Sequence, residues 1–368
     1  MNFNKKIKFK NFLINIKIKQ NFFCINNRYY FGYPIGEKKV FANKDLNYQC
    51  RNLFGYFFII EIKKDSIDFY TDVIGNYRVY YYYEKDFILI TDDLNEIYKK
   101  KKKNFFKIDE NTFNFFKLKN YTPGNTTFLN GIFKFQPASN YSIKNSNKFI
   151  IKNYYLNYKN TPNFRELKDK INRNFINQFK YLKNKKVVLF FSGGKDSLFI
   201  FYYLLKMKIN FECVFYDTQI KSVISDSIKF VKITCKQNKI KLRIIKIPLI
   251  IEPDFNKFLF SEMLFDYHYS LLHFSTFKKL KNIYNRNTIF VSGQSCDSIL
   301  SFGPSAYTVS NFIARYINLY PSNLFSSIFS KILNLKFKNK IFTSKNLKDF
   351  CVNFYNSFFY YSIECEKN

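Results

Sequence analysis

The segment Ser192-Gly-Gly-Lys-Asp-Ser197 combines residue types that bind phosphate. Two adjacent glycines let the backbone approach an anion closely, and a helix starting after them would offer unpaired N–H groups and the positive end of its dipole. Ser192 and Ser197 add hydroxyl donors, and Lys195 adds a positive charge. Asp196 would repel a bare phosphate, so it fits as a Mg²⁺ ligand. The segment predicts binding of a Mg²⁺-complexed phosphate; the alternative is an ordinary capped strand-to-helix turn.

The residues around this segment predict alternating strands and helices. The apolar run 187–191 reads as a buried strand directly before the glycines, and the residues after them have the apolar spacing of a helix. Strands that are apolar throughout and alternate with helices indicate a parallel sheet covered on both faces. Further strands are expected at 211–216, 242–247 and 288–292, and helices at 164–182, 225–237 and 261–285.

The glycine segment resembles the pyrophosphate loop of the ATP pyrophosphatase (PP-loop) enzymes. It fits neither the Walker loop nor the dinucleotide-binding GxGxxG pattern. Enzymes of the PP-loop superfamily split ATP between its α and β phosphates, usually by adenylating a substrate oxygen. The resemblance implies that ATP is bound near Phe191 and Tyr216, with adenine over the ends of the first two strands. It assigns pyrophosphate and Mg²⁺ binding to Ser192, Gly193, Gly194, Asp196 and Ser197.

A second glycine segment, Ser292-Gly-Gln-Ser-Cys-Asp-Ser298, follows a predicted strand about 100 residues later. It resembles the SGEGSDE-type loop of asparagine synthetases. By that match Asp297 holds Mg²⁺ together with Asp196, and Gly293 belongs to the nucleotide-binding loop. Two carboxylates on one metal-bound triphosphate provide the charge neutralisation that the chemistry needs. We expect catalytic roles for Asp196, Lys195 and Gln294.

The first part of the chain has the alternation and turn signals of strands. Runs at 55–62, 66–71, 78–83, 87–91 and 133–143 are aromatic and β-branched. The order of the segments Gly55-Tyr-Phe-Phe, Thr71-Asp-Val-Ile-Gly and Thr122-Pro-Gly-Asn resembles the glutaminase half of asparagine synthetases. We expect an α/β chain of two domains. Residues 1–158 form a β-rich, truncated N-terminal-nucleophile-hydrolase-like domain, and residues 159–368 form the parallel-sheet PP-loop domain.

Two departures from the family pattern restrict the activity expected. The glutaminase half of the family uses a cysteine exposed after removal of Met, whereas residue 2 here is Asn and the first cysteine is Cys24. Glutamine hydrolysis by that route is therefore not expected. Gln294 stands where asparagine synthetases have Glu, and a Gln cannot take up a proton at neutral pH. Ser298 replaces the family's second Glu, so an acceptor other than aspartate is expected.

Composition limits the remaining choices. Of 60 basic residues only eight are Arg, and a codon bias that enriches Lys, Asn, Ile, Phe and Tyr explains the net charge of +33 more simply than nucleic-acid binding does. The seven cysteines contain no CxxC pair, which favours reduced thiols over a zinc site. His268 and His273 are too few for a multi-histidine metal site. No apolar run approaches the roughly 18 residues of a membrane span, so we expect a cytoplasmic protein without a membrane partner.

These features predict an ATP- and Mg²⁺-dependent carbon–nitrogen ligase. It would adenylate a small-molecule carboxylate, release pyrophosphate, and transfer ammonia or an amine to form an amide. One alternative is a tRNA-modifying PP-loop enzyme similar to tRNA-lysidine synthetase, for which nucleic acid would be the partner. Another is a homologue that has lost catalysis and only binds nucleotide.

Overall fold

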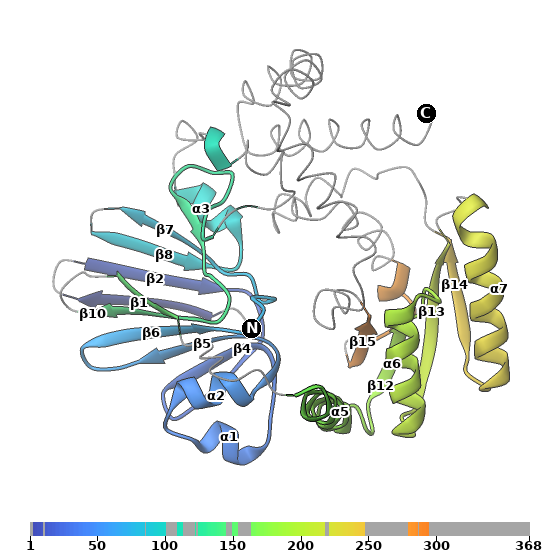
Figure 1. Cartoon of the computed structure of the whole chain (residues 1–368). Helices are drawn as coiled ribbons and strands as arrows, with labels where there is room; N and C mark the ends of the chain where they lie inside the picture. Colours follow the sequence, from blue (N-terminus) through green and yellow to red (C-terminus); the bar gives the residue numbers. More distant parts are fainter. Residues whose placement is uncertain are drawn as a thin grey trace, which may run out of the picture. The chain divides into compact units, whose positions relative to one another are not determined.

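The described residues of the computed structural model form two compact units, which are shown in Figure 1. The first unit contains described residues up to 153, and the second contains those from 163 onward. The boundary predicted between residues 158 and 159 lies outside the described residues. The structure describes residues 3–9, 12–84, 86–100, 109–112, 122, 124–144, 149–153, 163–217, 221–246, 279–285 and 287–293.

The first unit contains two β-sheets. One has five strands in the order β1-β2-β8-β7-β9: β1 (Phe3–Phe9), β2 (Phe12–Ile18), β8 (Phe87–Thr91), β7 (Tyr80–Glu84) and β9 (Ile132–Lys134). The other has six strands in the order β11-β10-β6-β5-β4-β3: β11 (Phe149–Asn153), β10 (Ser139–Lys144), β6 (Ser66–Thr71), β5 (Phe54–Ile62), β4 (Arg28–Ile35) and β3 (Phe22–Ile25). All their pairings are antiparallel except that between β2 and β8.

The core of this unit lies between the two sheets. Alternate residues of β2, β5, β8 and β10 meet there, because successive side chains of a strand point to opposite faces; examples are Ile14, Phe58, Ile90 and Tyr141. Short helices α1 (Lys38–Ala42) and α2 (Leu46–Asn52) cover the outer face of the six-stranded sheet. Helix α3 (Leu94–Lys100) contacts β7 and β8.

The predicted runs 55–62, 66–71, 78–83 and 87–91 correspond to β5, β6, β7 and β8, whereas two other features differ from expectation. The run 133–143 is two strands, β9 and β10, because Pro137 cannot donate a ladder hydrogen bond and Ala138 has a left-handed φ of 48°. Helices α1, α2 and α3 were not expected. They have only five to seven residues each, which is too short for a clear helical period.

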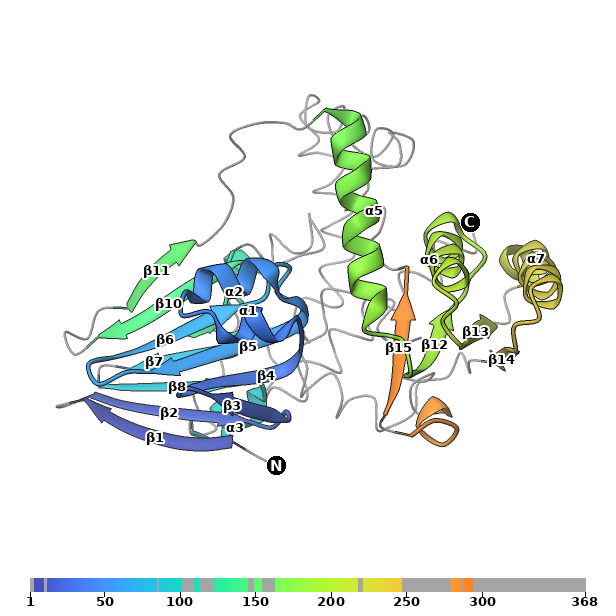
Figure 2. The same cartoon turned by 90° about the horizontal axis from the view of Figure 1, so that it is seen from below.

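The second unit contains the predicted parallel sheet. Its strands run in the order β14-β13-β12-β15, with β14 (Leu242–Lys246), β13 (Phe211–Asp217), β12 (Lys186–Phe190) and β15 (Thr288–Ser292), and every pairing is parallel. Helix α5 (Phe164–Lys180) precedes β12, α6 (Lys195–Lys206) joins β12 to β13, and α7 (Lys221–Gln237) joins β13 towards β14. Figure 2 shows α6 and α7 beside one another.

Both faces of the central strands are buried. Val187 and Leu189 of β12 pack with α5, α6 and α7 on one face, whereas Val188 packs with Leu280 and Tyr284 on the other. The connections from β12 to β14 therefore cover one face, and the segment before β15 covers the opposite face. The predicted cover on both faces of a parallel sheet is confirmed. Among the helices in the described ranges, none has the length and apolar content needed to cross a bilayer.

Candidate phosphate-binding site

The Ser192–Ser197 loop lies at the carboxyl edge of the parallel sheet. It connects the end of β12 to the start of α6. From β12 the chain proceeds to β13 on one side, whereas β15 pairs with β12 on the other side. The strand order thus reverses next to β12, and the carboxyl end of such a switch point is where open α/β sheets bind ligands.

Hydrogen bonds between the two serines fix the conformation of the loop. Ser197 is 4% exposed, and its Oγ donates to the carbonyl oxygen of Gly194 at 3.0 Å. The Oγ atoms of Ser192 and Ser197 are 3.2 Å apart, and the N–H of Gly194 reaches Ser192 Oγ at 3.3 Å. The two hydroxyls therefore hold the ends of the loop together. This internal role was not predicted, because it depends on the turn that brings the two serines into contact.

The start of α6 offers donors that its own residues do not use. Gly194 is the N-cap and provides no capping side chain. The N–H groups of Lys195, Asp196 and Ser197 precede the first residue that can bond within the helix, which is Leu198, whose N–H donates to the Gly194 carbonyl at 3.0 Å. Within the described residues these three N–H groups have no acceptor. They and the positive end of the helix dipole suit an anion.

Gly193 needs to be glycine for its conformation and for its surroundings. Its φ of +81° lies in the left-handed region, which side chains other than glycine rarely adopt. A Cβ at this position would lie 3.1 Å from Val231 Cγ2 and 3.2 Å from Phe230 Cδ1, both on α7. Helix α7 therefore forms a wall against the loop. The sequence contained no signal for this wall, because α7 is distant in the chain.

Gly293 brings the second glycine segment against the first. Ser292 pairs with Phe190, so the residue after β15 meets the start of α6. A Cβ on Gly293 would lie 2.6 Å from both Asp196 C and Ser197 N, and real Cβ atoms essentially never approach that closely. The two segments predicted to share a site are therefore in direct backbone contact at Gly293. Close packing therefore requires glycine at position 293. The sequence had assigned Gly293 to nucleotide binding.

The remaining predicted site residues divide into described and undescribed positions. Asp196 is half-buried in the first turn of α6, and Lys195 and Ser192 are exposed at the same edge. Gln294 and Asp297 lie outside the described residues, as do His268 and His273. The described part of the chain contains no cluster of three or more His, Cys, Asp or Glu side chains suited to a metal ion.

Adenine was expected near Phe191 and Tyr216. Phe191 is 1% exposed and stacks on Phe201 of α6 with ring centroids 4.8 Å apart, so its ring belongs to the core. The preceding residue, Phe190, points to the opposite face, because side chains alternate along a strand. It lies 5.1 Å from the ring of Tyr216 and stacks on Phe290. Burial raises the pKa of Tyr216, which therefore remains a neutral phenol.

The chain matches no protein-family model and no curated protein sequence. Among solved structures it is similar to the NH3-dependent NAD synthetase from Campylobacter jejuni subsp. jejuni NCTC 11168 in complex with the nitrate ion. The match has 15% sequence identity and a TM-score of 0.25, and it covers 49% of this chain and 86% of that chain. Similarity at this level identifies no activity. The class that can be stated is a mixed α/β protein whose parallel sheet carries a glycine turn at its switch point.

Proposed function

We propose that the chain is an ATP-dependent ligase of the PP-loop type, resembling asparagine synthetases, that forms an amide through an adenylated carboxylate. The observation that supports this most strongly is the contact of Gly293 with the Ser192–Ser197 loop at the sheet's switch point. The contact places the second glycine segment beside the unpaired N–H groups of the first, which is the arrangement that a nucleotide site built from two loops needs.

In this proposal the loop binds the β and γ phosphates of ATP. The free N–H groups at the start of α6 donate to phosphate oxygens, and Lys195 adds positive charge. Mg²⁺ would be held by Asp196, together with Asp297, and would neutralise the charge on the leaving pyrophosphate. The donor set fits both groups, because Asp196 stands half-buried beside the unpaired N–H groups.

The reaction has two steps that balance without a further reagent. A carboxylate oxygen of the substrate bonds to the α-phosphorus of ATP as the bond from that phosphorus to the bridging oxygen breaks, which releases pyrophosphate. The nitrogen of ammonia or an amine then bonds to the acyl carbon, loses a proton, and displaces AMP. Gln294 belongs to the second loop in this proposal and would contribute a hydrogen bond rather than a proton transfer.

The proposal is tested by ATP–pyrophosphate exchange with purified protein and Mg²⁺. Radiolabelled pyrophosphate is incubated with ATP and one pool of acceptors at a time: amino acids, other carboxylates, or total tRNA. Exchange into ATP is expected with a carboxylate pool in the absence of ammonia, because adenylation is reversible before the nitrogen arrives. Asp196→Asn should abolish exchange, and Asp169→Asn, an exposed acid on α5, serves as the matched control.

Two outcomes would contradict this function. Exchange that occurs only with tRNA would favour a tRNA-modifying enzyme. Protein that binds ATP but shows no exchange with any pool would favour a nucleotide-binding protein without catalysis. Equal exchange in wild type and Asp196→Asn would contradict the assigned role of the loop.

A further inference from the structure

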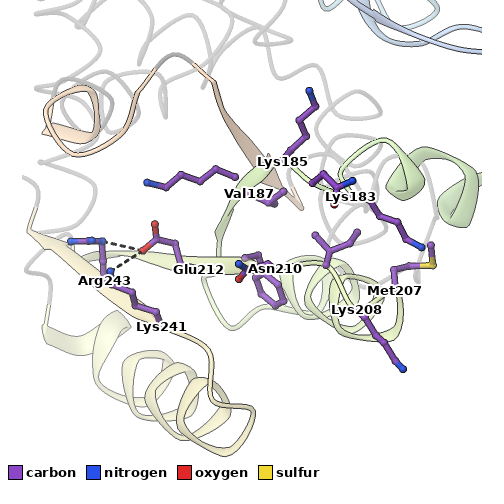
Figure 3. A pocket seen from close by; sticks show the side chains of 13 residues that line it. Lys183, Lys185, Val187, Met207, Lys208, Asn210, Glu212, Lys241 and Arg243 are labelled. Atoms are coloured by element: carbon purple, nitrogen blue, oxygen red, sulfur yellow. Dashed lines mark hydrogen bonds and ion pairs between the residues drawn. The ribbon is translucent and has the colours of Figure 1, made fainter.

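A second concave site lies at the opposite edge of the parallel sheet. It has a volume of about 900 Å³ and is shown in Figure 3. Its residues come from the turn between α5 and β12, the turn between α6 and β13, and the start of β14. These segments precede the strands, whereas the phosphate-binding loop follows them. Because the strands are parallel, the two sites lie at opposite ends of the same sheet.

The pocket has a large excess of positive charge. Glu212 is the only acid that lines it, and its carboxylate is 3.1 Å from Arg243 Nε and 3.7 Å from Lys241 Nζ. Six cations against one carboxylate leave a formal charge of +5. Within the described residues the other four cations have no acidic partner within 4 Å. The six cations are Lys183, Lys185, Lys186, Lys208, Lys241 and Arg243.

The charge around the pocket differs from that on α5 of the same unit. The first two turns of α5 alternate cations and acids, as in Glu166, Lys168, Asp169 and Lys170. Around the pocket, by contrast, six cations face the single carboxylate of Glu212. A general excess of lysine in the composition explains the number of cations on the surface, but it does not explain why they gather around a cavity.

The turns that carry these lysines are held by backbone hydrogen bonds. The N–H of Lys185 donates to the Leu182 carbonyl at 3.1 Å, and the N–H of Lys208 donates to the Leu205 carbonyl at 2.9 Å. Lys208 adopts a left-handed φ of 51°, at a position where glycine is common. The backbone is therefore set before a ligand arrives, which lowers the entropy lost on binding.

The lining indicates the chemical class of the ligand. The ammonium groups in Figure 3 are spread around the pocket rather than gathered at one point, which suits several linked anionic groups better than one phosphate. Lysine acts as a point charge without the fixed geometry of Arg. The apolar residues at the base, Val187, Ile209 and Phe211, are buried, so no aromatic ring is exposed for stacking a base. Glu212 is occupied by two cations and does not offer a Mg²⁺ ligand.

We propose that this pocket binds a soluble oligophosphate in its metal-free form, at a site separate from the phosphate-binding loop. The ligand carries at least two linked phosphates, and the lysines at the amino edge of the sheet neutralise them. This inference does not depend on the function proposed above, because the two sites share no residue.

The test is calorimetric titration of the full chain with inorganic tripolyphosphate in the presence of EDTA. EDTA removes the Mg²⁺ that the other site is proposed to need, and the pocket variant identifies the part of the binding that belongs to the pocket. The pocket variant is Lys183→Gln/Lys185→Gln/Lys208→Gln. The matched control is Lys168→Gln/Lys170→Gln/Lys232→Gln, which removes three exposed lysines from α5 and α7.

We expect one tripolyphosphate per wild-type chain, with an affinity that falls as salt rises. The pocket variant should bind at least about tenfold more weakly, whereas the control should stay within about twofold of wild type, because its three lysines do not line the pocket and salt screens exposed charges. Equal weakening in both variants would show attraction by net charge alone and would overturn the proposal. The proposal would also be overturned if a single-stranded RNA 12-mer bound through the pocket lysines and tripolyphosphate did not.

Discussion

Replacing Gly293 by alanine tests the contact between the two glycine segments. The new Cβ would lie 2.6 Å from Asp196 C and Ser197 N and 2.9 Å from Asp196 Cβ. Ordinary van der Waals contact begins at 3.4 Å, so β15 and the start of α6 must separate by about 0.8 Å. All three opposing atoms belong to the backbone or lie next to it, and they cannot move aside by changing rotamer. Overpacking of this kind costs about 1–3 kcal/mol.

The assay is equilibrium unfolding in urea, compared with a matched glycine in the same site. Gly194 has a φ of −72°, and a Cβ there meets only Ser192 Oγ at 3.4 Å. Gly194→Ser should therefore leave the free energy of unfolding unchanged or raise it, because Ser is a good N-cap. Gly293→Ala should lower it by about 1–3 kcal/mol. If Gly293→Ala unfolds at the same urea concentration as wild type, Gly293 does not contact the backbone of α6, and the proposed two-loop site is contradicted.

Three further predictions concern single residues. Tyr141 is fully buried, and burial raises the pKa of its hydroxyl from 10.0 to about 12. The folded state therefore keeps this proton above pH 10, where the unfolded chain loses it, and stability falls as pH rises from about 10 to about 12. Tyr141→Phe should lose less stability across that window than wild type, and an equal loss in unfolding titrations would contradict the burial. Lys239 follows α7 with a left-handed φ of 55°, so Lys239→Gly should raise the free energy of unfolding by about 0.5–1 kcal/mol. Lys236→Gly, inside the helix, should lower it by about 1 kcal/mol. A loss of stability at both positions would contradict the left-handed conformation. Ser197→Ala should cost about 1 kcal/mol in thermal or urea unfolding, because the Gly194 carbonyl loses one of its two donors and Ser192 Oγ loses its partner. Unchanged stability would show that the hydroxyl does not hold the loop.

The sequence was informative where local pattern decides structure. The apolar run 187–191 predicts a strand buried on both faces, and the two glycines after it interrupt the strand before a helix with clear apolar spacing. β15 was predicted at its observed bounds, Thr288–Ser292, for the same reason. These elements depend on their own residues and on general rules of α/β sheets.

The sequence was uninformative where distant segments meet. The alternation along β12 places either Phe190 or Phe191 towards the helices, and only the packing of Phe201 decides between them. The wall that Phe230 makes against Gly193 depends on the path of α7. The basic pocket has the same origin, since its lysines come from three turns that no local pattern connects.

The proposed function requires the Ser192–Ser197 loop to bind ATP for cleavage between its α and β phosphates. This requirement is tested by separating the products of ATP turnover with Mg²⁺, ammonia and the acceptor pool that supports exchange. AMP and pyrophosphate in equal amounts, formed by wild type and Asp169→Asn but not by Asp196→Asn, are the predicted result. ADP and inorganic phosphate as the products, or AMP formed equally by Asp196→Asn, would contradict the account.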